Sequence, residues 1–473
     1  MKSYVSAKDS ETLSLTNPFD GSKIDAAVQV AGGEDVDLAV AAAEVAFKSG
    51  PWSTYTGSQR AKCMLKFADL IESSLQELAE LVMVTMGAPL AMGHLMIPAV
   101  AQTFRYYASW ADKIEGESFA ADDGTYKIVR HEPLGVCAGI AAWNVPLLYV
   151  GWKIAPALAA GNTFIFKSSE KSPLSALALG NLVIEAGFPP GVIQFISGGS
   201  KTGALLASHM KISKISFTGS TVTGRKVQKL ALESNMKSCT LELGVKSPAL
   251  VFDDADIANA VGSTADGFFA NSAQVCVAGS RLMVQETIAP AFIEVVKERF
   301  AVASSGLGAD PKGGTSMHGP MADEAQFNRV MSYIDPGKKF TDPVVGGNRK
   351  GDKGFFIEPT LFVNPDRKGK VFNEEIFGPV LSIVTFKIEE EAIQMANDTV
   401  TGLSASVYTS NITRALRVAA KIDSGTVSID APHFPSLQVP FGGFKESGNG
   451  KELGKYGLQS YLRTKTVLIN MKL

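Results

Sequence analysis

The sequence predicts an α/β protein built on parallel, doubly wound sheets, and two series of alternating elements carry that prediction. From about residue 134 to 252, short apolar runs typical of buried strands alternate with stretches of helical periodicity. A second strand–helix series runs from about 256 to 430. Alternation of this kind produces parallel sheets, which bind ligands beyond the carboxyl ends of their strands. The chain has 473 residues, enough for about three domains or subdomains.

The expected elements follow one another in a regular order. Helices are expected at 35–49 and at 58–86, with Ser58 capping the second and Gly50-Pro51 separating them. The strands expected in the first series are 135–142, 163–167, 192–196, 213–218, 238–243 and 249–252. The helices expected between most of them are 147–160, 172–187, 201–210 and 221–233.

The C-terminal part of the chain predicts a loop and then a strand. The Gly-rich segment 438–450 is typical of a loop, and 458–470 has the β-branched character of a strand. No local partner is evident for this strand, so it is a candidate for pairing with another chain.

Composition narrows the kinds of partner. The chain has 45 Lys+Arg and 47 Asp+Glu, for a net charge of −2, and no block of like charge. Nucleic acid and acidic membrane surfaces are therefore not expected as partners. Residues 134–152 carry no charge, but Asn144-Val145-Pro146 would break a membrane-spanning helix. We expect a buried strand, a loop and a helix there instead.

Cysteine usage points to a reducing compartment. The four cysteines show no CxxC pairing and no metal-like histidine spacing, so neither a disulfide framework nor a metal site is expected. No N-terminal run combines basic residues with an apolar core, so no signal peptide is expected. The expected location is the cytoplasm.

A glycine turn after a strand is a candidate phosphate site. The strand at 213–218 ends at Gly219-Ser220-Thr221, and a helix follows with Gly224 in its first turn. Free N–H groups and the helix dipole would favour a pyrophosphate there. The full GxGxxG fingerprint is absent, and by itself the pattern is more often only a turn.

Cys276 and Glu242 are the candidate reactive groups. A free cysteine is usually inert core packing, but Cys276 alone of the four lies in a loop-like stretch, 271–281. No histidine occurs in a triad signature. Glu242 ends an apolar strand, where burial would raise its pKa into the range of a general base. A structural pairing of Glu242 with a lysine stays open.

Seven motifs in order resemble those of the aldehyde dehydrogenase family across nearly the whole chain. The motifs are Ala142–Pro146 (AWNVP), Lys167–Glu170 (KSSE), Phe217–Ser220 (FTGS), Leu241–Gly244 (LELG), Gln274–Cys276 (QVC), Glu374–Pro379 (EEIFGP) and Pro440–Gly443 (PFGG). Each is modest alone, but their order and spacing make the resemblance specific.

The resemblance implies a fold and an assembly. The expected fold is aldehyde dehydrogenase-like, with a Rossmann-type cofactor domain, an α/β catalytic domain and a small β-extension for oligomerisation. The ranges implied are 1–120 and 134–245 for the NAD-binding domain, 246–450 for the catalytic domain, and 121–133 with 451–473 for the extension. A homodimer or homotetramer is expected.

The resemblance also implies a reaction. Cys276 would attack the aldehyde carbon to form a thiohemiacetal, and then a thioester. The Asn144 amide and the Cys276 N–H would hold the oxyanion, and Glu242 would activate the water that releases the acid. Lys153 completes the implied catalytic set.

The implied cofactor is NAD. Its expected contacts are Trp143, Lys167, Glu170, Gly219, Ser220, Gly244, Glu375 and Phe377. The Glu170 carboxylate would bond ribose hydroxyls and repel a 2′-phosphate, which favours NAD over NADP, although Lys167 leaves NADP open.

The residues matched to the aldehyde tunnel are mostly apolar or aromatic. They are Val145, Leu148, Tyr149, Trp152, Val275, Val277, Phe434 and Phe441. No arginine is present among them to clamp a carboxylate, so we expect an apolar or aromatic aldehyde rather than a semialdehyde acid. Several of these residues could instead be simple core.

Four positions depart from the family pattern, and two other functions stay open. Ala142 replaces a proline, Ala273 and Val245 replace glycines, and Asp430 stands where asparagine is common. Val245 is the departure that adds a branched side chain beside the Glu242 loop. The alternatives are a CoA-acylating relative, which Glu242 disfavours, and a non-enzymatic cofactor-binding protein, which the intact reactive groups disfavour.

Overall fold

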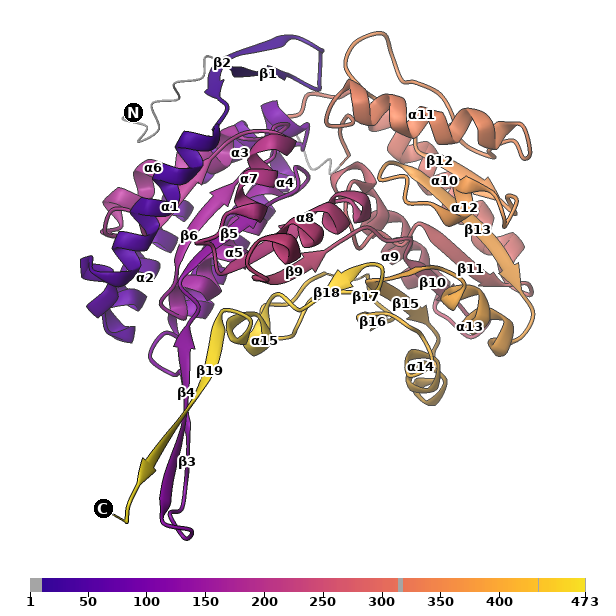
Figure 1. Ribbon diagram of the computed structural model, residues 1–473. Coiled ribbons are helices and arrows are strands. Elements are labelled where there is room, and N and C mark those ends of the chain that lie inside the picture. The colour runs from indigo at the N-terminus through magenta and orange to yellow at the C-terminus, as the bar shows by residue number, and fades with distance from the viewer. Residues whose placement is uncertain (1–10, 314–317, 433, 473) are drawn as a thin grey trace.

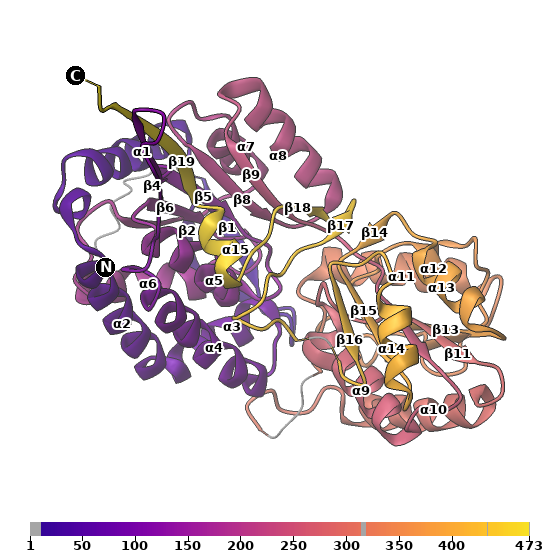
Figure 2. The ribbon, with the colours of Figure 1, turned by 90° about the horizontal axis from the view of Figure 1, so that it is seen from below.

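The computed structural model describes residues 11–313, 318–432 and 434–472. The chain forms two lobes, each built around a six-stranded sheet, and a slender β-arm that extends away from the first lobe (Figure 1). Seen from below, the two lobes lie side by side and the C-terminal segment passes between them (Figure 2). The expected α/β fold is confirmed.

The N-terminal segment is an antiparallel strand pair followed by helices. Its elements are β1 (Thr12–Thr16), β2 (Lys23–Gln29), α1 (Gly33–Lys48), the 3₁₀ helix η1 (Pro51–Thr54), α2 (Gly57–Ser73), α3 (Leu75–Met86) and α4 (Leu90–Ala108).

The prediction of a single helix at 58–86 is wrong, because the helix is interrupted at Ser74, between α2 and α3. The Ser73 hydroxyl bonds to the Asp69 carbonyl at 2.8 Å. Serine competes with the backbone for such bonds, so two consecutive serines weaken a helix. The cap is also two residues earlier than expected, since the Thr56 hydroxyl accepts the N–H of Gln59 at 3.3 Å.

The first lobe is built on a sheet of order β18-β9-β8-β5-β6-β7. Its parallel strands are β5 (Val136–Ile140), β6 (Thr163–Lys167), β7 (Ile193–Ile196), β8 (Lys214–Thr218) and β9 (Ser238–Glu242). The helices between them are α5 (Pro146–Ala159), α6 (Leu174–Glu185), α7 (Ser200–Ser208) and α8 (Thr221–Ser234).

Side chains alternate between the two faces of this sheet, as the strand period requires. Ala138 and Ile140 pack with α1, α7 and α8, whereas Cys137 packs on the other face with α2 to α6. Both faces are therefore covered by helices, which explains why the strands are uniformly apolar in sequence.

The second lobe is built on a parallel sheet of order β12-β13-β11-β10-β15-β16. Its strands are β10 (Pro248–Val251), β11 (Arg281–Gln285), β12 (Thr360–Val363), β13 (Val380–Phe386), β15 (Ser404–Tyr408) and β16 (Thr426–Ile429). Its helices are α9 (Ile257–Phe269), η2 (Ala270–Ala273), α10 (Ala289–Gly306), α11 (Glu324–Lys338), α12 (Lys370–Asn373), α13 (Glu389–Asn397) and α14 (Ile412–Ala419).

The C-terminal tail pairs within its own chain. Residues 458–459 end the helix α15 (Gly454–Gln459), and the strand is β19 (Leu462–Asn470). β19 pairs antiparallel with β4 (Thr125–Pro133), which also pairs with β3 (Glu117–Phe119) (Figure 1). The partner of this strand is not local, as expected, because it lies more than 300 residues earlier in the same chain.

The Gly-rich segment is a loop with two short strands. β17 (Phe444–Lys445) pairs with β14 (Thr401–Gly402) of the second half, and β18 (Gly448–Asn449) pairs with β9 of the first sheet. These pairings tie the two lobes together. Residues 134–152 form β5, a loop and the start of α5, as expected, and no helix in the described ranges is long and apolar enough to span a membrane.

Two neighbouring positions of α2 test the packing of the first lobe. Met64 is fully buried, whereas Leu65 is 44% exposed. We expect Met64→Ala to lower the free energy of unfolding by about 2–5 kcal/mol, because it leaves a cavity, and Leu65→Ala to change it by about 0.5 kcal/mol or less. Urea titration measures both, and equal effects would contradict this placement of α2.

Candidate active site

The carboxyl ends of four parallel strands lie side by side in the first sheet. Ile140 of β5 pairs with Lys167 of β6 and with Phe217 of β8, and Thr218 pairs with Glu242 of β9. The residues at the ends of these strands therefore gather at one edge, where a doubly wound sheet binds ligands.

The turn after β8 presents the start of a long helix. Ser220 caps α8 by accepting the N–H of Thr223 at 3.3 Å, and first-turn N–H groups have no intrahelical acceptor. A Cβ at Gly219 would come within 2.6 Å of the Phe217 ring, so only glycine fits without moving that ring. This turn offers N–H donors and the positive end of a helix dipole to an anion.

Glu375 reaches this edge from the second half of the chain. A Cβ at Gly244 would come within 2.5 Å of the Glu375 carboxylate, which places the two residues in direct contact. Burial raises the pKa of Glu375 to about 7, and a hydrogen bond from the Val245 N–H partly opposes that rise. The structure thus brings the expected cofactor residues Gly244 and Glu375 together.

Two more expected pairs also lie together. The Lys167 amine is 3.7 Å from the Glu170 carboxylate, and burial lowers the pKa of Lys167. The Glu170 side chain is 48% exposed, so its carboxylate can meet a ligand. The Trp143 and Phe377 rings meet edge to face, with centroids 5.3 Å apart.

Two hydrogen bonds hold the Asn144 side chain beside the cysteine loop, and a third holds its backbone carbonyl. Its Nδ2 donates to the Gln274 carbonyl at 2.9 Å, and its Oδ1 accepts from the Tyr149 hydroxyl at 3.0 Å. Asn271 donates to the Asn144 carbonyl at 2.9 Å. An amide nitrogen carries two hydrogens, so the second hydrogen of Nδ2 is left for a ligand oxygen.

Cys276 follows a left-handed turn. Asn271, Ser272 and Ala273 have φ values of 52°, 60° and 58°, in the region that favours glycine. Ala273, where the family usually has glycine, therefore carries backbone strain of about 1–2 kcal/mol. The Ser272 hydroxyl and the Gly319 backbone hold the turn by bonding each other in both directions, at 2.9 and 2.7 Å.

The Cys276 thiol, which is half-buried, and the buried Glu242 carboxyl both have raised pKa values. Burial raises the pKa of the Cys276 thiol to about 12, and the charges of Glu375 and Glu242 add to the rise. Burial also raises the pKa of Glu242 well above its ordinary value, with a further rise from the charge of Glu452. Neither carboxylate oxygen of Glu242 has a hydrogen-bond partner among the described residues. Glu242 is therefore free to hold a proton or a water.

Lys153 is not among the described residues that line the pocket at Cys276. It lies in an ion pair with Glu452 instead. Its amine donates to the Glu452 carboxylate at 2.5 Å, to Ser216 at 2.9 Å and to Thr218 at 2.8 Å. Its positive charge lowers the pKa of Glu242 and partly offsets the effect of burial. Lys153 therefore acts on the site through Glu242. The partner Glu452 has no signal in sequence, because it lies 299 residues away.

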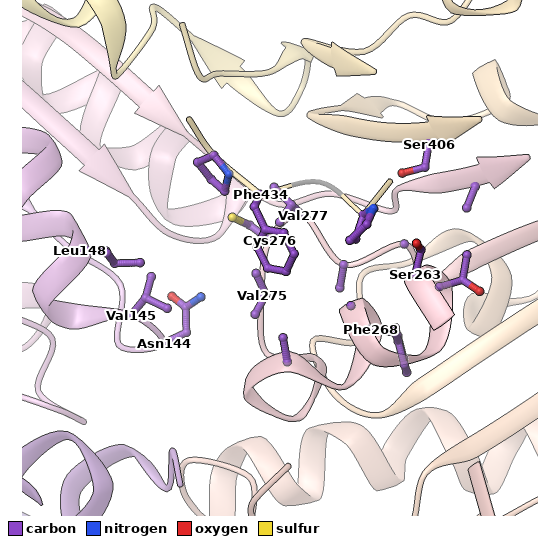
Figure 3. Close-up of a pocket in the computed structure, with 18 of the residues that line it drawn as sticks. Asn144, Val145, Leu148, Ser263, Phe268, Val275, Cys276, Val277, Ser406 and Phe434 are labelled. Carbon is purple, nitrogen blue, oxygen red and sulfur yellow. The ribbon is translucent and has the colours of Figure 1, made fainter. Parts of the chain in front are cut away.

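A cavity of about 120 Å³ opens at Cys276, between the two lobes (Figure 3). The expected substrate residues that line it are Val145, Leu148, Tyr149, Trp152, Val275, Val277 and Phe434. Phe441 is not among its described lining residues. It is buried behind Trp152, with ring centroids 5.3 Å apart.

Several lining residues escaped the sequence analysis because they come from distant elements. Met92 lies on α4, Phe268 and Ser263 on α9, and Ser406 and Tyr408 on β15. Their periodicity shows only that they belong to helices or strands. Nothing in a single sequence indicates that these elements meet at Cys276.

The fold and this site together define a class: a two-lobed α/β protein with a dinucleotide-type sheet and a cysteine pocket between the lobes. The model described as the aldehyde dehydrogenase family matches residues 4–467. The chain is 46% identical over 471 residues to the protein named aldehyde dehydrogenase from Alternaria alternata, covering 99% of this chain and 94% of that protein. It is 43% identical over 472 residues to retinal dehydrogenase 2 from Homo sapiens, covering 99% and 90%.

A solved structure agrees with this match. The NAD⁺ complex of aldehyde dehydrogenase from Bacillus cereus superposes with a TM-score of 0.94 at 39% identity, covering 98% of this chain and 94% of that one. The chain belongs to the aldehyde dehydrogenase family. The expected family, fold and enzyme class are confirmed.

The Lys153–Glu452 ion pair makes a testable contribution to stability. Both side chains are buried, at 0% and 5% exposure. We expect Lys153→Met to lower the free energy of unfolding by about 3–5 kcal/mol, because it leaves the Glu452 charge buried and unpaired. The double variant Lys153→Met/Glu452→Gln removes that charge and should recover part of the loss in a urea titration. A Lys153→Met protein as stable as wild type would contradict the pairing.

Proposed function

We propose that this enzyme oxidises an apolar or aromatic aldehyde to the carboxylic acid with NAD⁺, through a covalent adduct on Cys276. One observation carries the proposal: Cys276 and the fixed amide of Asn144 line one apolar pocket, and the Glu242 carboxylate, which has no hydrogen-bond partner among the described residues, is near enough to raise the pKa of the Cys276 thiol. A nucleophile, an oxyanion donor and a base are thereby present in one place.

The residues at the sheet edge fit a dinucleotide. The α8 N-terminus at Gly219-Ser220 would hold the pyrophosphate, and Lys167 with Glu170 would hold the adenosine ribose. Glu375, packed on Gly244, would hold the nicotinamide ribose, with Trp143 and Phe377 beside it. The half-exposed Glu170 carboxylate would repel a 2′-phosphate, which supports NAD over NADP. When bound, NAD⁺ supplies the acceptor for the hydride that leaves the substrate.

Cys276 forms the first bond. Its sulfur attacks the aldehyde carbon to give a thiohemiacetal, and the thiol proton passes to a base. Glu242 suits this role because its raised pKa makes its carboxylate a stronger base than that of an ordinary glutamate. The free hydrogen of Asn144 Nδ2, with the Cys276 N–H, stabilises the oxyanion, and such a donor contributes about 3–4 kcal/mol to lowering the barrier.

Glu242 then prepares the release of product. Loss of hydride from the adduct leaves an acyl group bound to sulfur as a thioester. Glu242 first releases to solvent the proton that it took from the thiol, and its carboxylate then accepts a proton from a water whose oxygen attacks the thioester carbonyl. The acid departs, and the proton on Glu242 returns to the sulfur to restore the Cys276 thiol. Lys153 is a positioning residue here, because it acts only through the charge of Glu242.

A CoA-acylating reaction is the second candidate. In that reaction a thiol rather than water takes the acyl group, so no carboxylate is needed beside the thioester. The unpartnered Glu242 carboxylate favours water. Product analysis with and without CoA separates the two reactions.

Assembly and location remain proposals. The three-stranded arm leaves one edge of β19 free, and we propose that residues 121–133 and 451–473 mediate a homodimer or homotetramer. Native mass measurement tests this. The cytoplasm is the proposed location, and the ranges 1–120 with 134–245, and 246–450, are the proposed cofactor and catalytic domains.

The choice of substrate and nucleophile is tested with an aldehyde panel. We expect higher kcat/KM for hexanal and benzaldehyde than for succinic semialdehyde, because the described lining residues include no arginine. NADH absorbance reports each rate. Cys276→Ala should be inactive, and Cys239→Ala, a cysteine outside the pocket, should stay active. A preference for the semialdehyde acid contradicts the substrate, and activity in Cys276→Ala contradicts the mechanism.

The pH dependence tests Glu242. Water activation needs the carboxylate, so kcat should rise with pH through a pKa above the ordinary 4.5 of a glutamate. Glu242→Gln should lose that dependence and about 10²–10⁴-fold in kcat. A stoichiometric burst of NADH should remain but be slower than in the wild type, because solvent must then take the thiol proton and the thioester is not hydrolysed. A Glu242→Gln protein with the wild-type rate and pH profile would exclude this base.

A further inference from the structure

The pocket at Cys276 has a polar end that the reaction does not use. Ser263 of α9 and Ser406 and Tyr408 of β15 line it together with the apolar residues. In the view of Figure 3, Ser263 and Ser406 lie on the opposite side of Cys276 from Asn144. Asn144 marks the place of the aldehyde oxygen, so these hydroxyls lie where the rest of the substrate would extend.

The three hydroxyls form one cluster. The Tyr408 hydroxyl is within hydrogen-bonding range of those of Ser406 and Ser263, and it donates its own hydrogen to the Ala431 carbonyl at 3.3 Å. Each hydroxyl has one hydrogen and two acceptor lone pairs. The Ser263 hydroxyl donates its hydrogen to the Asn259 side chain at 3.3 Å, so the cluster offers a ligand the Ser406 hydrogen and the spare acceptor sites of both serine oxygens.

The cluster is open to the pocket because its neighbours are small. Ala249, Ala270 and Gly279 line the same pocket and fill little of it. Ser263 and Ser406 are only half-buried, although the Tyr408 ring is 1% exposed. The two serine hydroxyls are thus the groups that a substrate can reach.

The local charge favours a neutral group. Among the described lining residues there is no lysine or arginine. The negative charge of Asp430 adds to the rise in the pKa of Tyr408, so a second anion there would be repelled. A carboxylate is therefore disfavoured, whereas an uncharged hydroxyl can both donate and accept within the cluster.

We propose that the Ser263–Ser406–Tyr408 cluster binds a neutral hydroxyl group at the far end of the substrate, which is then an aldehyde with an apolar body. This rests on the proposed function and narrows its substrate class. A methyl group in the same place would leave the spare hydrogen-bonding sites of the cluster unpaired, and a site built for hydrogen bonds discriminates against such analogues.

Shape-matched substrates and variants test the cluster. We compare kcat/KM for 4-(hydroxymethyl)benzaldehyde and 4-ethylbenzaldehyde, and for 8-hydroxyoctanal and nonanal. In at least one pair, kcat/KM of the wild type should be about tenfold higher for the hydroxylated aldehyde than for its methyl analogue. In Ser263→Ala/Ser406→Ala the ratio of these two values should fall to about one. The matched control is Thr264→Val, whose hydroxyl donates to Ala260 of its own helix at 2.7 Å. Its ratio should stay that of the wild type. Because each ratio is taken within one preparation, a misfolded fraction cancels.

The outcomes separate the two proposals. A wild type that oxidises the aldehydes of both pairs without preference, or a double variant that keeps the preference, overturns the cluster and leaves the aldehyde oxidation intact. Loss of the preference in Thr264→Val also overturns it, because the effect would not depend on the Ser263 and Ser406 hydroxyls. Absence of any NADH with all four aldehydes overturns the proposed function, and the cluster proposal with it.

Discussion

The hydrogen bond from Asn144 Nδ2 to the Gln274 carbonyl is the contact on which the arrangement of the site depends. Asn144 precedes α5 in the first lobe, and Gln274 lies in the loop that carries Cys276 in the second. The same bond orients the Asn144 amide and fixes the loop. The second amide hydrogen and the Cys276 thiol therefore face the same pocket. Relative motion of the lobes would separate the oxyanion donor from the nucleophile.

The proposed chemistry depends on carboxyl groups that the fold buries without placing them in an ion pair with another described residue. Glu242 and Glu375 have raised pKa values because burial disfavours their charged forms. Lys153 and Glu452 form an ion pair next to Glu242, so the charge of one nearby carboxylate is compensated, while Glu242 has no hydrogen-bond partner in the part of the chain that the structure describes. A buried, unpaired carboxylate costs stability, and it is also the state in which glutamate can take up and release a proton near neutral pH.

The departures from the family pattern fall at positions with different physical consequences. Ala273 and Asp430 both have positive φ, so each carries strain that glycine or asparagine would reduce. Val245 is buried, is not among the residues with positive φ, and donates its N–H to Glu375. Its branched side chain therefore sits in packed core without backbone strain, while its backbone takes part in holding a proposed cofactor ligand.

The sequence by itself determined the strand–helix order, the position of Glu242 at a strand end and that of Cys276 in a loop, because hydrophobic period and turn chemistry are local properties. The motif order extended this to the family and to most of the candidate site. Only the tertiary structure decided that Glu452 pairs with Lys153, that β19 returns to β4, that Phe441 lies behind Trp152, and that Ser406 and Tyr408 reach the pocket. These contacts join residues from distant elements, and the packing of whole helices and sheets against one another sets them.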